Sequence, residues 1–274
     1  MPITNGIGHS KHTENKQIGL GALLVQHISI VKSVLNKCPY YPQTYQYIDL
    51  NSGDGVNEEK GADGEKLDGS PVIFLKKIDG QMKYYGHFIE LEEVNTFYLR
   101  TRTSFTNYHT IYTGDSREIL PGIIRTLDAK SYGLIYADPN GLPYFDLLGT
   151  VSEKLPKMDI LIRYPAASAK RNGRSLEAGL KSVKKSYWIV QEPEGKHQWT
   201  FLLGTNFDKY KAWRKYGFHR VDSEDGKAVF ERLSLTKDER KTLYQPELVQ
   251  LTATAREFVF ERAGGTCEVC KKKA

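Results

Sequence analysis

Apolar residues recur at helical spacing from residue 18 to residue 35. The stripe consists of Leu20, Leu23, Leu24, His27, Ile28, Val31 and Leu35. Because positions three and four apart lie on one side of a helix, this spacing predicts a leading amphipathic helix. Pro39 and Pro42 follow it and predict its end.

Beyond this helix, short apolar runs alternate with helical patterns. Strands are predicted over residues 45–50, 84–91, 108–112, 132–137 and 158–163, and helices over residues 70–78, 94–105, 119–127 and 145–155. Strands that alternate with helices pair in parallel, with helices on both faces of the sheet. Further strands predicted at 187–190, 199–203 and 228–233 have shorter connections, which favours an antiparallel edge. The pattern therefore predicts an α/β fold with a doubly wound, mostly parallel sheet.

Two stretches stand outside this alternation. The stretch from Val56 to Gly69 is polar, carries seven charged residues and has no apolar face, so we expect a solvated loop. It leads to Ser70, the expected N-cap of the next helix, with Pro71 at the first helical position. After Leu233 the sequence becomes charged and helical. We therefore predict a sheet domain over residues 1–233 and a short helical appendage over residues 234–274.

The composition narrows the class of protein. Of the 274 residues, 39% are hydrophobic and 26% are charged, which is ordinary for a soluble globular protein. No stretch is expected to span a bilayer, and the polar N-terminus lacks the apolar core of a signal peptide, so we expect a cytoplasmic protein without a membrane partner. The net charge of +6 is compatible with a polyanionic partner such as nucleic acid.

Polar and glycine residues follow each of the first four predicted strands. They are Asp49, Asn51, Gly53 and Gly55 after the first, Glu90 after the second, Asp115 after the third, and Asp138, Pro139 and Asn140 after the fourth. Each is also what a plain turn requires, but ligands of doubly wound folds bind beyond the carboxyl ends of the strands. Glycines allow close approach of a ligand to the backbone. A carboxylate such as that of Glu90 can accept hydrogen bonds from two ribose hydroxyls, and Asp115 from an exocyclic adenine amine.

A dinucleotide-binding oxidoreductase would use the same residue types at different spacing. Its G-x-G-x-x-G loop opens a helix directly, whereas about a dozen polar residues follow Gly55 before a helix can start. The spacing therefore argues against that class.

The segments YIDLNSGDG, DGSPVIFL, FIELEE, TGD, IYADPNGLP and DILIRYP occur in this order. The series resembles the motifs of class I S-adenosylmethionine methyltransferases, and in particular the three-Cys-motif partner family, over about residues 16 to 233. The resemblance implies a Rossmann-like methyltransferase fold with S-adenosylmethionine as cofactor. The sequence departs from the family pattern at Asn51-Ser52, where a Phe-Ala pair is usual, and in the inserted stretch after Gly55.

The turn after the fourth strand predicts the chemistry. Methyltransferases that act on base amines place a polar residue and a proline there, whose oxygens accept hydrogen bonds from the amine of a flipped base. Asp138 and Pro139 match this arrangement, but Asn140-Gly141 replaces the second proline and the aromatic. We expect methylation of a nucleic-acid base, with DNA favoured over RNA. The alternative is a non-catalytic cofactor- or partner-binding module associated with an HNH nuclease.

Two further segments suggest partners. Arg163, Lys170, Arg171 and Arg174 lie in a basic run beyond the fifth strand and are predicted to contact phosphates, with a solvated face as the equally weighted alternative. Near the C-terminus, REFVFERAGGTCEVC resembles the opening of an HNH nuclease domain, in which Cys267 and Cys270 would supply two zinc ligands. No second pair of ligands follows, so an incidental cysteine pair is the alternative. A nuclease or a small Cys-motif protein is the corresponding partner.

Overall fold

The computed structural model describes residues 13–60, 66–139, 143–165, 176–193, 199–208 and 213–235. The chain divides into two compact units, Met1–Ser234 and Leu235–Ala274. The described residues belong almost entirely to the first unit. The predicted helical appendage lies outside them and stays a prediction.

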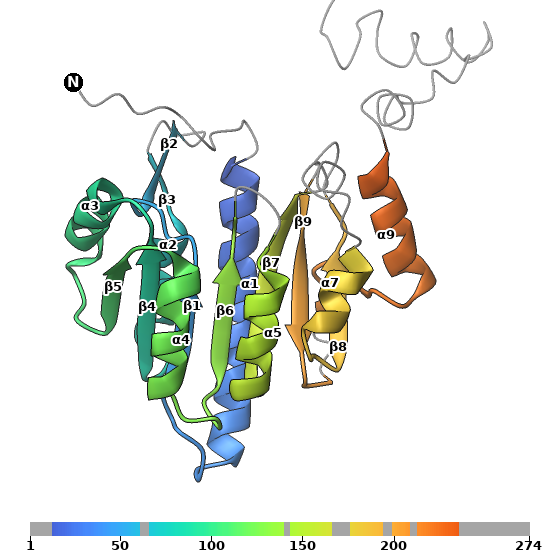
Figure 1. Cartoon of the computed structure of the whole chain (residues 1–274), viewed down its shortest axis with the longest axis horizontal. Helices are drawn as coiled ribbons and strands as arrows, with labels where there is room; N and C mark the ends of the chain where they lie inside the picture. Colours follow the sequence, from blue (N-terminus) through green and yellow to red (C-terminus); the bar gives the residue numbers. More distant parts are fainter. Residues whose placement is uncertain are drawn as a thin grey trace, which may run out of the picture. The chain divides into compact units, whose positions relative to one another are not determined.

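A single mixed sheet forms the centre of the first unit. In spatial order its strands are β5 (His109–Thr113), β4 (Tyr84–Glu90), β1 (Tyr45–Asp49), β6 (Gly133–Ala137), β7 (Met158–Pro165), β9 (Trp199–Thr205), β8 (Tyr187–Gln191) and β10 (Phe218–Arg220). The strands from β5 to β7 pair in parallel, and β9, β8 and β10 add an antiparallel edge. The prediction of a doubly wound, mostly parallel α/β sheet with an antiparallel edge is confirmed (Figure 1).

Helices cover both faces of this sheet (Figure 1). They are α1 (Thr13–Lys37), α2 (Ser70–Ile78), α3 (Glu93–Thr103), α4 (Ser116–Thr126), α5 (Phe145–Lys154), α7 (Leu176–Ser182) and α9 (Glu224–Ser234). Because successive strand residues point to opposite faces, β1 contributes to two cores. Tyr45 and Tyr47 pack with α1 and α2, and Ile48 packs on the other face with α4 and α5. Both faces of the sheet are therefore packed against helices.

Helix α1 packs as its apolar stripe predicts. All seven stripe residues, including His27, are at most 4% exposed. The segment Lys16–Lys37 has a mean hydropathy of 1.7 and is long and apolar enough to span a membrane, contrary to the expectation from sequence. Buried core helices share this length and composition, and the stripe of α1 joins the core that contains Tyr47 and Phe74. The helix is therefore only a weak indication of a membrane span.

The stretch expected to be a solvated loop forms a hairpin instead. Strand β2 (Val56–Lys60) pairs antiparallel with β3 (Lys66–Asp68). The backbone N–H of Gly69 donates to the carbonyl oxygen of Gly55 over 2.9 Å and closes the base of the hairpin. A two-stranded ribbon outside the main sheet needs no buried apolar face, so the sequence carries no alternating signal for it.

A second expectation fails near the end of the first unit. The strand predicted over residues 228–233 is part of helix α9, and β10 lies before it. Val229 and Leu233, four residues apart, are both about one twentieth exposed and form the buried side of the helix. A short apolar run cannot distinguish a strand from a buried helix by period, which explains the error.

Candidate functional site

The loops after β1, β4, β5 and β6 are bonded to one another at the carboxyl edge of the sheet. The N–H of Gly53 donates to Oε2 of Glu90 over 2.8 Å, and the N–H of Gly114 donates to the carbonyl oxygen of Glu90 over 2.9 Å. The N–H of Asp138 donates to Oδ1 of Asn51 over 3.2 Å. The residues predicted from four separate turns are therefore neighbours in space.

The glycine loop after β1 has the backbone conformation that glycine favours. Gly53 has φ 61° and Gly55 has φ 84°, both in the left-handed region. A Cβ on Gly55 would lie 2.9 Å from Cδ1 of Leu99, so any side chain would collide with α3. A Cβ on Gly53 would meet nothing within 4 Å. The space beside Gly53 is thus open to a ligand that approaches the backbone.

Glu90 links several segments at this edge by accepting hydrogen bonds from them. Its Oε1 accepts from the N–H of Glu92 over 3.1 Å and from Nδ2 of Asn95 over 3.0 Å, while Oε2 accepts from Gly53. An ionised carboxylate offers about four acceptor positions, so about three are occupied. A ribose would use the remaining position or replace one of these donors.

Asp115 serves first as the N-cap of α4. Its carboxylate accepts from the N–H of Arg117 over 2.8 Å and forms an ion pair with the guanidinium of Arg117, 2.5 Å from Nη2. Hydrogen bonds from Arg117 lower the pKa of Asp115. The predicted contact with an adenine amine has to share this carboxylate and stays a prediction.

Asp49, at the end of β1, is completely buried. It accepts from the N–H of Asn51 over 3.1 Å, and the hydroxyl of Tyr47 lies 3.4 Å from Oδ2. Burial raises the pKa of Asp49 to about 7, although hydrogen bonds from Ser70 and Asn51 favour the ionised form. Ser70, expected as the N-cap of α2, lies inside the helix, and Gly69 takes the cap position. Asp49 therefore titrates near neutral pH.

Asp138, at the end of the neighbouring strand β6, is held by two cations. Its Oδ2 lies 2.9 Å from Nζ of Lys16, and its Oδ1 lies 3.0 Å from Nη1 of Arg163. The hydroxyl of Tyr136 donates to Oδ2 over 3.2 Å. Burial acts to raise the pKa of Asp138, but the charges of Lys16 and Arg163 outweigh it and lower the pKa. Asp138 is therefore ionised at neutral pH while nearby Asp49 is close to its midpoint.

Lys16 is the member of this network that sequence reasoning missed. It lies in the first turns of α1, far in sequence from Asp138, and its side chain is 20% exposed. A lysine at the start of an amphipathic helix carries no signal of its own. Only the packing of α1 beneath the sheet brings it to the end of β6.

Arg163 lies on β7 and points toward this network. Its side chain is 22% exposed, and its guanidinium carbon lies 5.8 Å from the ring centroid of Trp199. A phosphate contact, as predicted for Arg163, has to compete with Asp138. Pro139 is buried.

Several predicted residues fall outside the described part of the chain. They are Asn140, Lys170, Arg171, Arg174, Cys267 and Cys270. Within the described residues, no group of three or more His, Cys, Asp or Glu side chains could hold a metal ion. The predicted zinc ligands lie outside these residues, and no observation supports a zinc site.

Comparisons with known proteins give only distant structural likenesses. No model of a known protein family matches the chain, and no curated protein matches it. A solved protein from Legionella pneumophila is 14% identical and superposes over 77% of this chain and 90% of its own, with a TM-score of 0.49. The N-methyltransferase NodS from Bradyrhizobium japonicum is 10% identical over 72% of this chain and 97% of its own, with a TM-score of 0.39.

A fibrillarin/Nop5p complex gives a further match, 14% identical over 60% of this chain and 73% of the other, with a TM-score of 0.43. Likenesses this distant add nothing to the fold assignment, which rests on strand order and helix layers. Membership in the three-Cys-motif partner family and the HNH-like knuckle are unsupported and stay predictions.

Proposed function

We propose that the chain is an S-adenosylmethionine-dependent methyltransferase that acts on an amino group of a nucleic-acid base, with DNA favoured over RNA. The supporting observation is the direct bonding between the glycine loop and Glu90 at the carboxyl edge of the sheet. In doubly wound folds this edge is where ligands bind.

The cofactor would be held by Asp49, Asn51, Gly53, Gly55, Glu90 and Asp115. The open space beside Gly53 fits a ligand that approaches the backbone closely. The remaining acceptor position of Glu90 fits one ribose hydroxyl, and a second hydroxyl would replace one of the present donors. S-adenosylmethionine supplies an activated methyl group when bound. The protein's own part is to hold the methyl donor and the acceptor in line. Such positioning accelerates transfer between two bound reactants.

The methyl acceptor would bind at the turn formed by Asp138, Pro139 and Asn140. A target amine would donate to the Asp138 carboxylate, which is ionised and therefore acts only as an acceptor. Oδ2 already accepts from Lys16 and Tyr136, and Oδ1 accepts from Arg163. The amine would therefore use the remaining acceptor position at Oδ1 or replace one of these donors. The basic run of Arg163, Lys170, Arg171 and Arg174 would then contact the phosphates of the same nucleic acid.

Calorimetric titration tests the cofactor assignment first. The wild type should bind S-adenosylmethionine, and Glu90→Ala should weaken binding by about 1 to 3 kcal/mol, since the acceptor and its link to Gly53 are both lost. Glu92→Gln is the matched control, because Glu92 contributes only its backbone N–H to Glu90. Equal affinity of the Glu90→Ala variant would refute the assignment.

Methyl transfer separates the enzyme from the alternative. The wild type should incorporate labelled methyl groups into a mixed panel of DNA and RNA, and Asp138→Ala should abolish incorporation while cofactor binding persists. Cofactor binding without incorporation by either protein would favour the non-catalytic module associated with an HNH nuclease. The replacement of the aromatic position by Asn140-Gly141 is the observation that keeps this alternative open.

A further inference from the structure

Helix α3 has its apolar side turned to solvent. The residues it buries against the sheet are Thr96, Leu99 and Thr103. The exposed apolar residues on and beside it are Leu91, Val94, Phe97, Tyr98 and Phe105, with Phe97 65% exposed and Val94 58% exposed. A helix on the surface of a monomer normally shows the opposite arrangement.

The buried side of α3 is polar because its threonines contact polar side chains of β5. Thr113 on β5 donates through its hydroxyl to Oγ1 of Thr96 over 3.1 Å, and Oγ1 of Thr103 lies 2.9 Å from Nε2 of His109. Asn95 and Arg102 bond to the loops after β4 and β1. These contacts fix how α3 is rotated. On its outer side, Phe97 and Tyr98 contact each other, and Arg102 lies over the Tyr98 ring.

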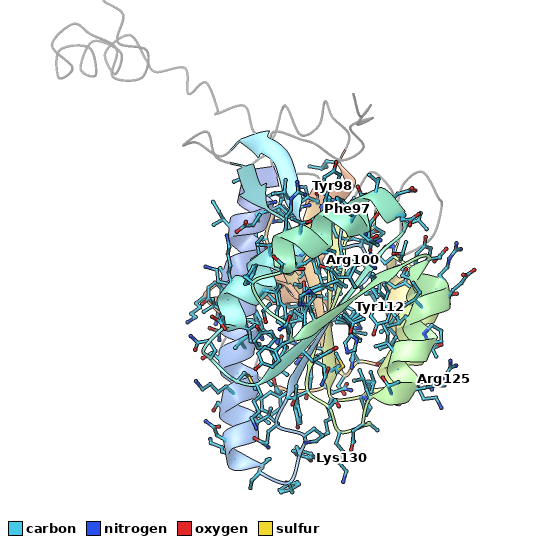
Figure 2. All side chains as sticks on the ribbon, turned by 90° about the vertical axis from the view of Figure 1, so that its left-hand side faces the viewer. Phe97, Tyr98, Arg100, Tyr112, Arg125 and Lys130 are labelled. Atoms are coloured by element: carbon cyan, nitrogen blue, oxygen red, sulfur yellow. The ribbon has the colours of Figure 1, made fainter. Side chains whose placement is uncertain are left out.

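The exposed side of α3 continues onto the end of the sheet. Strand β5 is the last strand on this side and pairs only with β4 among the described residues. Figure 2 shows Phe97, Tyr98 and Arg100 on α3 above Tyr112 of β5, all toward the same side of the molecule. Contiguous exposed apolar surface of this kind marks sites of protein association.

Two charges on α3 indicate which protein covers it. Glu93, Phe97 and Arg100 follow one another at helical spacing of four and three residues, so they share one side of the helix. Neither charged side chain has an ion-pair partner within the described part of the chain. Along the helix, Glu93 therefore precedes Phe97 and Arg100 follows it.

We propose that this surface binds a second copy of the chain, through antiparallel packing of α3 against α3 across a two-fold axis. In that arrangement Glu93 of each protomer meets Arg100 of the other, and the two Phe97 rings pack near the axis. The same patch is used on both subunits, as a two-fold interface requires. A stable interface takes about 800 Å² from each partner, so the proposed interface would have to include the adjoining edge at β5 as well as α3.

Nucleic acid fits this surface less well. Its exposed residues are mainly apolar, and Glu92 and Glu93 are both exposed at the start of α3, where they repel phosphates. The dimer does not depend on methyl transfer or on cofactor binding. A site for another protein is the competing outcome of the test.

Sedimentation of the full chain over a range of concentrations tests the proposal. The wild type should dimerise. Glu93→Arg and Arg100→Glu should each weaken the dimer at least about tenfold, because each places two like-charged pairs in the interface. Circular dichroism checks that both variants fold, and Glu224→Arg on α9, at the other end of the sheet, is the matched control.

The decisive sample is an equimolar mixture of the two single variants. Its mixed dimer contains two opposite-charge pairs, so association should return toward the wild-type level, as it should in the doubly exchanged variant. A monomeric wild type would overturn the proposal. So would single variants that dimerise normally, or a mixture that stays monomeric, since only a self-complementary interface gives this pattern of loss and recovery.

Discussion

Asp49 gives the sharpest test of the electrostatics at the strand ends. The substitution Asp49→Asn keeps the size of the side chain and removes its charge. The amide oxygen can still accept from the N–H of Asn51, and the amide nitrogen can donate to the hydroxyl of Tyr47. The comparison of variant and wild type therefore isolates the cost of ionising a carboxyl group that is completely buried.

The direction of the effect follows from proton uptake. Because burial raises the pKa of Asp49 from 3.8 to about 7, the folded protein holds a proton between these values that the unfolded chain has lost. Stability from this group is therefore fully present below about pH 4 and is lost as the pH rises through 7. The whole difference is worth about 4 kcal/mol, at about 1.4 kcal/mol for each pH unit.

Urea unfolding at a series of pH values measures this pH-dependent contribution of Asp49 to stability. Between pH 5 and pH 8 the free energy of unfolding of the wild type should fall by about 3 kcal/mol relative to Asp49→Asn, since the two curves diverge until the pH reaches about 7. The variant should be the more stable protein at pH 8. Parallel curves over this range would refute the reasoning.

Asp138→Asn is the control, because the contribution of Asp138 to stability has the opposite pH dependence. Because the pKa of Asp138 is lowered, its contribution is present above the usual carboxyl pKa and is lost as the pH falls below that value and through the lowered pKa. Removing its charge leaves Lys16 and Arg163 without their shared counter-ion, which should cost about 2 to 4 kcal/mol at neutral pH.

Two other predictions concern the sheet and the basic run. A Cβ on Gly133 would lie 1.8 Å from the carbonyl oxygen of Gln46 on the paired strand, so Gly133→Ala should cost at least about 3 kcal/mol in thermal unfolding, or prevent folding. Gly122→Ala, inside α4 and free of close contacts, should instead stabilise by about 1 kcal/mol, and equal effects of the two would contradict the account. Replacing Lys170, Arg171 and Arg174 together should flatten the salt dependence of nucleic-acid binding, and an unchanged slope would identify the run as a solvated face.

The sequence predicts the architecture well where a long apolar period exists. The stripe of α1 predicts that helix, and the sequence predicts the five parallel strands β1, β4, β5, β6 and β7 within a few residues of their bounds. The antiparallel edge was predicted from short connections, but α9 was taken for a strand because its apolar run is too short to show a period. The hairpin β2–β3 was missed because its stability comes from backbone pairing, which leaves no side-chain pattern.

The position of the candidate site could be predicted from the sequence, but its hydrogen bonds and ion pairs could not. The order of turns places Gly53, Glu90 and Asp138 at one edge, because parallel strands share the same carboxyl side. Which side chains bond to one another depends on packing between residues far apart in the chain, such as Lys16 and Asp138, separated by 122 positions. Single-sequence patterns contain no information about such pairs.

The ion pair between Arg163 and Asp138 also couples two roles that the sequence predicts independently. Arg163 was predicted to contact phosphate and Asp138 to accept a target amine, yet in the structure each is the partner of the other. A phosphate that draws Arg163 away would remove one of the two cations on Asp138 and free Oδ1 as an acceptor, while Lys16 stays at Oδ2. Under the proposed function, binding of nucleic acid would then prepare the acceptor for the amine. Until substrate arrives, the ion pair with Arg163 supplies the partner of Oδ1, while Lys16 and Tyr136 hold Oδ2.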